Sequence, residues 1–294
     1  MKRNLSIVTL LLLAFFMVGP AVSADLLNGN NKKKQSEKNP LLELVDEANF
    51  KTGMDAYKRG DYAAALKEWK PLAEQGLAKA QHNLGTIYDF GQGVLEDDKM
   101  AVKWYRKAAK QGNAYSQAHL AQAYENGEGV LEDEQMALKW YRKSAENGVP
   151  QAQQNLALIY QEGWGVPQDD KMAVKWYKKA AAQGMAIAQT NLGKMYFEGR
   201  GVFQDYKIAF KWWKPAAEQG DADAQTNLGA LYFAGLGILQ DYTKAHMWGN
   251  IGASNGNERG VSLRDQVAKK MTSAQIAEAQ KLARECVKNK YKGC

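Results

Sequence analysis

The sequence predicts an all-α fold, a right-handed α/α superhelical solenoid in which pairs of helices repeat along the chain. Two observations predict it. Written in rows of 36 residues, columns of alanine, leucine and tyrosine recur without a gap, and one column holds six glycines: Gly76, Gly112, Gly148, Gly184, Gly220 and Gly256. A period of this length is typical of solenoids, because each unit buries its apolar face only against its neighbours. The 294 residues, which length alone would divide into two ordinary domains, are therefore expected to form one repeat array.

The first 24 residues have the pattern of a secretory signal peptide. Lys2 and Arg3 precede an apolar run from Leu5 to Val18, and small residues lead to Ala24, after which we expect cleavage. The run is shorter than the roughly 20 residues of a membrane-spanning helix, so an uncleaved anchor is the less favoured alternative. We expect the mature chain to be periplasmic or secreted, with no membrane span after cleavage.

A polar linker, residues 25–43, leads to a first helical pair, residues 44–76. The linker contains three consecutive lysines from Lys32 to Lys34. The first pair contains the segment GMDAYKRGDYAAALKEW, in which Gly60 and Asp61 mark the turn between two helices. This pair lacks the longer loop of the units that follow, and we expect it to begin the superhelix.

Residues 77–256 contain five units of 36 residues, numbered here repeats 1 to 5, each with a helix A and a helix B. In repeat 1, Leu84, Ile87 and Tyr88 have the spacing of an amphipathic helix, and a Gly-x-Gly pair then ends helix A. Asp97 can cap the start of helix B, which carries the aromatic pair Trp104-Tyr105. The capping aspartate recurs in the other repeats as Asp133, Asp169, Asp205 and Asp241.

Residues 257–294 are expected to form a helical cap with a basic tail. Thr272 or Ser273 can cap a last amphipathic helix. Both cysteines of the chain, Cys286 and Cys294, lie in this segment, and they either form a disulfide that ties down the tail or remain free thiols. Neither cysteine has a histidine in its local segment, so we do not expect them to be catalytic.

The net charge of +7 does not indicate a nucleic-acid partner. Without Lys2 and Arg3, the chain carries 37 basic and 32 acidic residues, a net charge of +5. Residues 259–294 carry nine basic and three acidic residues, a net charge of +6, so residues 25–258 are close to neutral. Because the excess charge is confined to the tail of an exported chain, we predict no nucleic-acid binding.

The sequence offers little material for catalysis or metal binding. It contains only three histidines, His82, His119 and His246, and two cysteines. The sequence has no motif of a zinc protease, a serine hydrolase, a phosphate-binding loop or a dinucleotide-binding fold. Acidic loops such as Glu96-Asp97-Asp98 lack the ligand spacing of an EF-hand. We therefore predict a non-enzymatic protein with no cofactor and no metal.

The repeat unit resembles a known family. Units such as DDKMAVKWYRKAAKQGNAYSQAHLAQAYENGEGV are similar to Sel1-like repeats, relatives of the tetratricopeptide repeat, in length, in the Gly-x-Gly-Val loop and in the WY…AA…G helix. The first pair resembles a tetratricopeptide unit, and the segment after repeat 5 resembles the capping region of this family. Some cysteine-rich relatives are β-lactamase-like hydrolases, but no repeat here contains a cysteine. Hydrolase activity is therefore the least favoured function.

The resemblance implies a groove lined by the A helices. In tetratricopeptide superhelices, side chains one turn on either side of a small residue point into the concave groove, and the small residues here are Gly85, Ala121, Ala157, Gly193 and Gly229. This geometry selects the following partner-binding candidates: Phe50, Met54, Tyr57, His82, Thr86, Asp89, Gln122, Glu125, Gln154, Gln161, Thr190, Lys194, Phe197, Thr226 and Phe233. For Phe197 and Phe233, packing against the adjacent A helix is the alternative.

These expectations together describe an exported adaptor or scaffold that holds a partner protein or peptide in its groove. Amides and exposed aromatic rings also suit sugars, because a sugar presents both polar and flat apolar surface. An envelope protein that binds peptidoglycan or another glycan is therefore the alternative.

Overall fold

The computed structural model describes residues 40–294, with side chains from residue 43 onward. The predicted signal peptide, its cleavage after Ala24 and most of the predicted linker lie outside the described residues. The chain divides into two units, Met1–Glu43 and Leu44–Cys294, and all helices from α3 onward belong to the second. In the described part of the chain, no helix is both long enough and apolar enough to span a bilayer.

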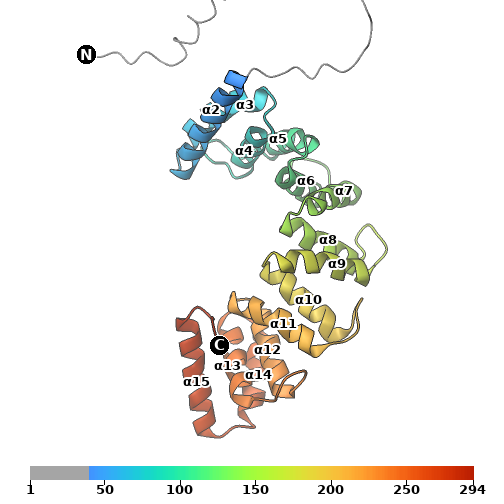
Figure 1. The fold of residues 1–294 in the computed structure, drawn as a ribbon, viewed down its shortest axis with the longest axis vertical. Coiled ribbons are helices and arrows are strands. Elements are labelled where there is room, and N and C mark those ends of the chain that lie inside the picture. Colours follow the sequence, from blue (N-terminus) through green and yellow to red (C-terminus); the bar gives the residue numbers. More distant parts are fainter. Residues whose placement is uncertain (1–39) are drawn as a thin grey trace, which may run out of the picture. The chain divides into compact units, whose positions relative to one another are not determined.

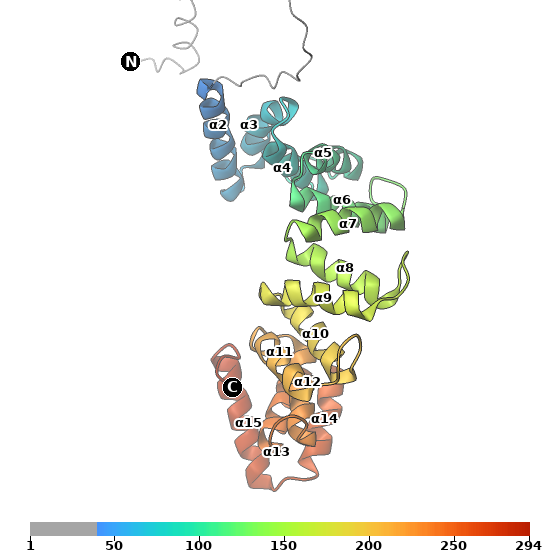
Figure 2. The same ribbon diagram turned by 45° about the vertical axis from the view of Figure 1, so that its right-hand side comes forward.

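Residues 40–294 fold into fourteen α-helices without strands (Figures 1 and 2). The first pair consists of α2 (Pro40–Lys58) and α3 (Tyr62–Glu74). The A helices of repeats 1 to 5 are α4 (Ala78–Asp89), α6 (Ala114–Asn126), α8 (Pro150–Glu162), α10 (Ala186–Glu198) and α12 (Ala222–Ala234). The B helices are α5 (Asp98–Lys110), α7 (Glu134–Glu146), α9 (Asp170–Ala182), α11 (Tyr206–Glu218) and α13 (Tyr242–Ser254), and the cap consists of α14 (Glu258–Ala268) and α15 (Ser273–Lys288). The predicted all-α repeat fold is confirmed.

From α3 to α14, successive helices pack against one another in chain order. Each A helix of the repeats contacts the B helix of its own repeat, each B helix of repeats 1 to 4 contacts the A helix of the next repeat, and α13 contacts both helices of the cap. The colours of Figure 1 follow this order from α3 to α15. Helix α2 begins at Pro40, four residues before the predicted start of the first pair. Proline suits the first position of a helix because its missing N–H would have no partner there.

An aspartate begins helix B in every repeat, as predicted, and a glycine ends helix A in repeats 2 to 5, whereas Phe90 ends it in repeat 1. In repeat 2, Gly127 ends α6 with a φ of +71°, a conformation that glycine adopts at little cost. Asp133 then caps α7 by accepting a bond from the backbone N–H of Met136 at 2.9 Å. The aspartates of the other repeats cap their B helices in the same way: Asp97, Asp169, Asp205 and Asp241.

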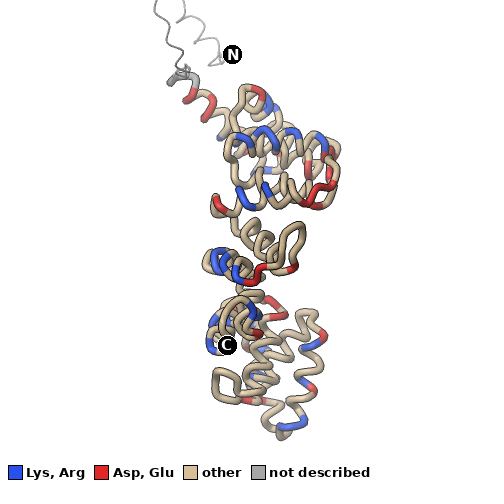
Figure 3. Tube along the Cα trace, turned by 90° about the vertical axis from the view of Figure 1, so that its right-hand side faces the viewer, with Lys and Arg blue, Asp and Glu red and all other residues tan. Residues whose placement is uncertain are grey.

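The recurring apolar columns form the core between helices. The leucine column is at most 1% exposed throughout: Leu84, Leu120, Leu156, Leu192 and Leu228. In repeats 1 to 3, the tryptophan of the aromatic pair on helix B is also buried, and in repeat 1 Lys107 Nζ lies 4.2 Å from the centroid of the Trp104 ring. In repeats 1 to 3, lysines of helix B therefore cover the tryptophan with their stems and face water with their ammonium groups. Figure 3 shows Lys and Arg interleaved with Asp and Glu along the described helices.

Both helices of the C-terminal cap, α14 and α15, pack on α13. Thr272 caps α15 in a capping box, in which its hydroxyl accepts from the N–H of Gln275 and the Gln275 side chain accepts from the N–H of Thr272. Ala279, Ala283 and Cys286 form the buried side of α15. The structure joins Cys286 to Cys294 by a disulfide, with an S–S distance of 2.07 Å.

Candidate partner-binding face

The predicted binding residues lie on six helices, α2, α4, α6, α8, α10 and α12. Twelve of the fifteen side chains are exposed or half-buried. We call the surface formed by these twelve residues the A-helix face: Phe50, Met54, Tyr57, His82, Thr86, Asp89, Gln122, Glu125, Gln161, Lys194, Phe197 and Phe233. The helical spacing therefore selects a largely accessible surface.

Three predicted residues are buried, although one of them, Thr190, still lines a cavity beside Lys194 and Phe197. Gln154, Thr190 and Thr226 are only 5%, 7% and 5% exposed. They lie one turn before the small residue, a position at which His82 of repeat 1 remains half-buried. The carbonyl of Thr190 accepts a bond from Trp213 Nε1 on α11 at 2.9 Å, and Thr226 Oγ1 fills the space that a Cβ on Gly252 of α13 would need. The Thr226 side chain thus packs against α13 beneath the face.

In repeats 1 to 3, a tyrosine of helix B forms a floor beneath the A-helix face. Tyr105, Tyr141 and Tyr177 are at most 2% exposed. Each hydroxyl donates to the side chain sixteen residues earlier on helix A: Tyr105 to Asp89 at 3.0 Å, Tyr141 to Glu125 at 2.5 Å and Tyr177 to Gln161 at 2.9 Å. Burial raises the pKa of all three phenols above their ordinary value, so the hydroxyls remain protonated donors. Sequence reasoning missed these bonds, although the recurring separation of sixteen residues could have indicated them.

In the first pair and in repeat 4, tryptophan replaces this tyrosine. Trp69 Nε1 donates to the carbonyl of Phe50 at 3.1 Å, and Trp213 Nε1 donates to the carbonyl of Thr190. The polar acceptor sixteen residues before Trp213 is replaced by Phe197, whose ring centroid lies 5.5 Å from that of Trp213. The floor is therefore apolar in these two units, and its hydrogen bonds go to the backbone.

The rings of Phe197 and Phe233 lie on helix B of their own repeats, an arrangement that neither predicted alternative described. Phe197 lies 5.2 Å from Tyr206 on α11, and Phe233 lies 5.8 Å from Tyr242 on α13, measured between ring centroids. Both phenylalanines remain half-buried. Part of each ring is therefore packed and part belongs to the A-helix face.

Two histidines that seemed unrelated in sequence meet in the structure. The ring centroids of His82 and His119 are 5.7 Å apart, and His119 is stacked on Tyr105 at 4.7 Å. His119 Nδ1 lies 3.8 Å from Asp89 Oδ2. Burial, and to a lesser degree His119, lowers the pKa of His82 to about 4. Burial also lowers the pKa of His119, although Asp89 opposes this shift, so both imidazoles are neutral near pH 7.

This cluster does not form an accessible nucleophile. His82 Nδ1 lies 3.0 Å from Ser116 Oγ, but Ser116 is fully buried. The third histidine, His246, is 2% exposed on α13, where burial lowers its pKa. Among the described residues, no group of three or more His, Cys, Asp or Glu side chains is arranged to hold a metal ion.

Two neighbouring cavities lie beside the histidine cluster. The first, of about 190 Å³, is lined by the carboxylates of Asp89, Asp98 and Glu128. The second, of about 510 Å³, lies between α6, α8 and the start of α10 and has a mainly apolar lining that includes Tyr141 and Met185. His119 and Gln122 line both cavities, so a single bound segment can reach the acidic cavity and the apolar one.

A third cavity, of about 240 Å³, lies at the tryptophan floor of repeat 4. It is lined by Lys194 and Phe197 of α10, Trp213 of α11, Asn227 of α12 and Arg259 of α14. Two ion pairs form at its lining: Arg259 with Asp223 at 2.6 Å and Lys194 with Glu198 at 3.9 Å. Its chemistry, with amides, paired charges and aromatic rings, differs from that of the acidic cavity between repeats 1 and 2.

A family model, the Sel1 repeat, matches five consecutive segments of the chain: residues 78–113, 114–149, 150–185, 186–221 and 222–257. Each segment begins one residue after the corresponding predicted unit. Together the matches span residues 78–257, which is more than half of the chain.

Solved structures of bacterial proteins are similar to this chain. A Sel1 repeat protein from Oxalobacter formigenes has 32% sequence identity and a TM-score of 0.70, over 80% of this chain and 96% of that one. The protein c5321 of uropathogenic Escherichia coli, a protective antigen with an SLR fold, has 30% identity and a TM-score of 0.41, over 84% of this chain and 70% of that one. No curated protein matches. The chain belongs to the Sel1 repeat family.

Proposed function

We propose that this protein is a non-enzymatic scaffold that binds a partner protein or peptide along its A-helix face. Sel1 repeat proteins commonly serve as scaffolds for protein–protein interaction. The observation that carries the proposal is the row of accessible side chains on six helices, held in place by the tyrosine and tryptophan floor beneath it. A face preorganised in this way loses little side-chain entropy when a partner binds.

The cavities along the face indicate an extended partner segment. The acidic cavity suits a basic side chain of the partner, and the adjoining apolar cavity suits a large apolar one. Because His119 and Gln122 form the wall between the two cavities, one peptide segment could fill both. The third cavity, near Lys194, offers amides and ion pairs that can exchange partners with a bound peptide. One segment that crosses several repeats would combine these contacts.

We favour a peptide partner over a glycan because the two tryptophan rings lie in the floor beneath the A-helix face and are not available for stacking. Trp69 and Trp213 are 1% and 3% exposed, so their ring faces are covered by protein. Sugar recognition by stacking needs an open ring face.

We further propose that the chain acts after export and after cleavage of the signal peptide following Ala24. N-terminal sequencing of the mature protein from the periplasmic and culture fractions would test this proposal.

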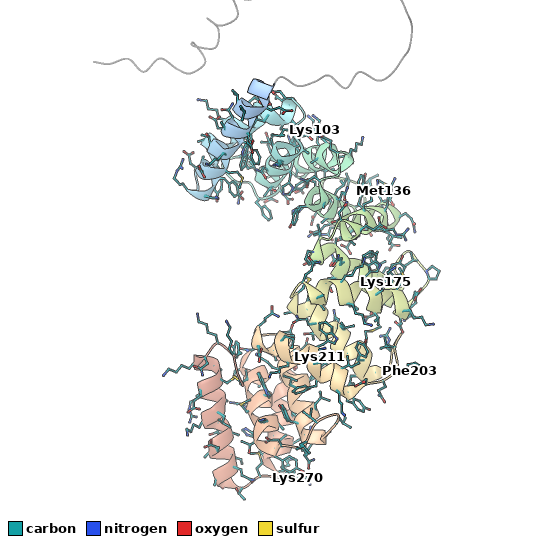
Figure 4. The ribbon with its side chains drawn as sticks, viewed as in Figure 1. Lys103, Met136, Lys175, Phe203, Lys211 and Lys270 are labelled. Carbon is teal, nitrogen blue, oxygen red and sulfur yellow. A yellow bond between two sulfur atoms is a disulfide. The ribbon has the colours of Figure 1, made fainter. Side chains whose placement is uncertain are left out.

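Site-specific photo-crosslinking tests the binding face. A photoreactive amino acid at Gln122 or Lys194, both exposed on A helices, should give a crosslinked protein or peptide adduct in cells. The matched control positions are Lys103 and Lys175, which are exposed on the B helices α5 and α9 (Figure 4). Adducts at the control positions alone would refute the proposed face. Sedimentation of the protein with purified peptidoglycan, unaffected by Lys194→Glu, would instead favour the glycan alternative.

A further inference from the structure

A row of large apolar side chains stands almost fully exposed at the loops between helices A and B. Leu95, Leu131, Phe203 and Leu239 are 91%, 89%, 96% and 90% exposed. They occupy one column of the 36-residue repeat, and repeat 3 has Pro167 there. Figure 4 shows Phe203 at the loop between α10 and α11. We call these four residues and Pro167 the loop-tip row.

The fold does not need large apolar side chains at these positions. The residue before each one already packs on the core, namely Val94, Val130, Val166, Val202 and Ile238. Repeat 3 keeps the same loop geometry with Pro167, so a leucine or phenylalanine is not required to form the loop. Isolated exposed apolar residues are common on proteins, but four nearly complete exposures in one structural column are not explained by packing.

Each of these loops lies against the start of helix B in the preceding repeat, which places the apolar tips one after another along the solenoid. Three contacts between successive repeats show this arrangement. Gln135 at the start of α7 donates to the carbonyl of Gly165 at 2.8 Å, and Arg200 pairs with Asp170 at the start of α9 at 2.8 Å. Gly129 is close enough to the backbone of Asp98 that a Cβ would overlap it. The apolar tips therefore follow one another along a single edge.

The charge beside the row indicates the kind of partner. The five loop segments 94–98, 130–134, 166–170, 202–206 and 238–242 contain ten Asp or Glu residues and no Lys or Arg. Five of the acidic residues are the helix caps. Of the others, Glu96, Glu132 and Glu134 are exposed, whereas Asp98 and Asp170 are half-buried. An apolar row with acidic flanks complements an apolar stripe with basic flanks, and it repels an anionic lipid surface.

We propose that the loop-tip row is a second docking surface, which binds a basic amphipathic helix of a partner protein. A helix of this kind presents apolar side chains along one stripe and lysine or arginine beside it. The surface is built from loop residues and is separate from the residues of the A-helix face. The protein would thereby hold two partners at once, one on each surface.

Binding of synthetic helices to the full chain tests this proposal. The probes are a labelled amphipathic leucine–lysine peptide, a leucine–glutamate peptide with the same apolar stripe, and a leucine–lysine peptide with scrambled order, measured by fluorescence anisotropy. We expect the amphipathic leucine–lysine peptide to bind at least about tenfold more tightly than either of the others, and added salt to weaken it. No binding of that peptide, or equal binding of all three, overturns the proposal.

Variants locate the binding on the row. The combined substitution Leu95→Gln, Leu131→Gln, Phe203→Gln and Leu239→Gln should weaken binding at least about tenfold, and Pro167→Leu should strengthen it a few-fold by completing the row. The matched control replaces exposed apolar residues elsewhere, Leu44→Gln, Val261→Gln and Val287→Gln, and should leave binding unchanged. Equal loss in the control, or no change with the four loop substitutions, overturns the proposal. All variants should keep the wild-type circular dichroism and melting temperature, because the replaced side chains are exposed.

Other occupants of the row give different results. Self-association of the wild type that the four loop substitutions abolish, measured by sedimentation velocity, would assign the row to a second copy of this chain and overturn the proposal. Flotation with vesicles of phosphatidylcholine and phosphatidylglycerol that depends on the same residues would assign it to lipid and do likewise. The photo-crosslinks at Gln122 and Lys194 should persist in the loop variant, so failure of the two docking surfaces can be distinguished.

Discussion

Repeats 1 to 3 and repeat 4 differ in the aromatic residue of helix B that packs beneath the A-helix face: it is tyrosine in repeats 1 to 3 and tryptophan in repeat 4. In repeats 1 to 3, a buried tyrosine fixes a polar side chain of the A-helix face through its hydroxyl, as Tyr141 does for Glu125. In repeat 4, Trp213 donates to a backbone carbonyl and packs against Phe197. The face above tyrosine therefore keeps an oriented carboxylate or amide, whereas the face above tryptophan is aromatic.

The size of the floor ring is matched by the small residue on helix A. Gly53 and Gly193 face Trp69 and Trp213, and a Cβ at either glycine would overlap the indole. Repeats 2 and 3 have alanine at this position, Ala121 and Ala157, with tyrosine as the floor. Repeat 1 shows that ring position matters as well as ring type, because a Cβ at Gly85 would overlap Tyr105, which is stacked on His119.

Removing the indole should have the largest effect. Trp213→Ala should lower the free energy of unfolding by about 3–5 kcal/mol, because Trp213 is 3% exposed and its loss leaves a cavity between α10 and α11. Urea denaturation followed by circular dichroism measures the change. The control Phe203→Ala, at a side chain that is 96% exposed, should stay within about 0.5 kcal/mol of wild type. Equal effects of the two substitutions would mean that the tryptophan floor does not support the fold.

The fold could be predicted from the sequence because its determinants are local and repeated. Asp97 and its four equivalents identify the starts of the B helices, and each caps the helix as expected. The leucine and alanine columns identify the buried sides, because the helical period fixes which residues share a face. The repeat length then places these features in every unit.

Parts of the candidate site could not be predicted, because they depend on how neighbouring helices cross. Helical spacing placed Thr190 on the A-helix face, but Thr190 is buried where Trp213 of α11 packs beneath α10 and donates to the Thr190 carbonyl. His82 and His119 are 37 residues apart, one more than the period, and so occupy different columns. Only the packing of α4 against α6 brings their rings together.

Acid should destabilise the tyrosine floor of repeat 1 through His82. The pKa of His82 is about 4 in the folded chain and about 6.5 in the unfolded chain, so between these values the unfolded chain binds more protons. Stability is therefore retained above about pH 6.5 and falls as the pH drops toward 4, by up to about 3 kcal/mol from this group. His119 acts in the same direction, whereas the raised pKa of Asp89 acts in the opposite direction.

The variant His82→Gln tests this sign. Its free energy of unfolding should fall less than that of the wild type between about pH 7 and pH 4.5, as measured by urea denaturation at each pH. Burial also lowers the pKa of His246 on α13, so His246→Gln should reduce the acid loss as well, and the double variant His82→Gln, His246→Gln should lose less stability in acid than either single variant. If His82→Gln steepens the acid loss, or if its pH profile matches that of the wild type, the assignment to His82 is wrong.

The match between the small residue and the ring predicts a rescue. Gly193→Ala should cost about 1–3 kcal/mol through overlap with Trp213, even though alanine favours a helix more than glycine does. The double variant Gly193→Ala, Trp213→Tyr recreates the alanine and tyrosine pair of repeats 2 and 3, and it should be more stable than Gly193→Ala alone. A double variant no more stable than the single one would show that the two floors are not interchangeable.

The smallest effect separates the tyrosine hydroxyl from the ring. Tyr141→Phe keeps the packed ring but removes the bond to Glu125, and it should cost about 0.5–1.5 kcal/mol in urea denaturation. Tyr115→Phe, at a side chain that is 61% exposed, is the control and should change stability by less than about 0.5 kcal/mol. Because the hydroxyl also orients Glu125 on the A-helix face, Tyr141→Phe should weaken crosslinking at neighbouring Gln122 more than it weakens crosslinking at Lys194, above the tryptophan floor. Equal effects at both positions would mean that the tyrosine bonds stabilise the fold without shaping the binding face.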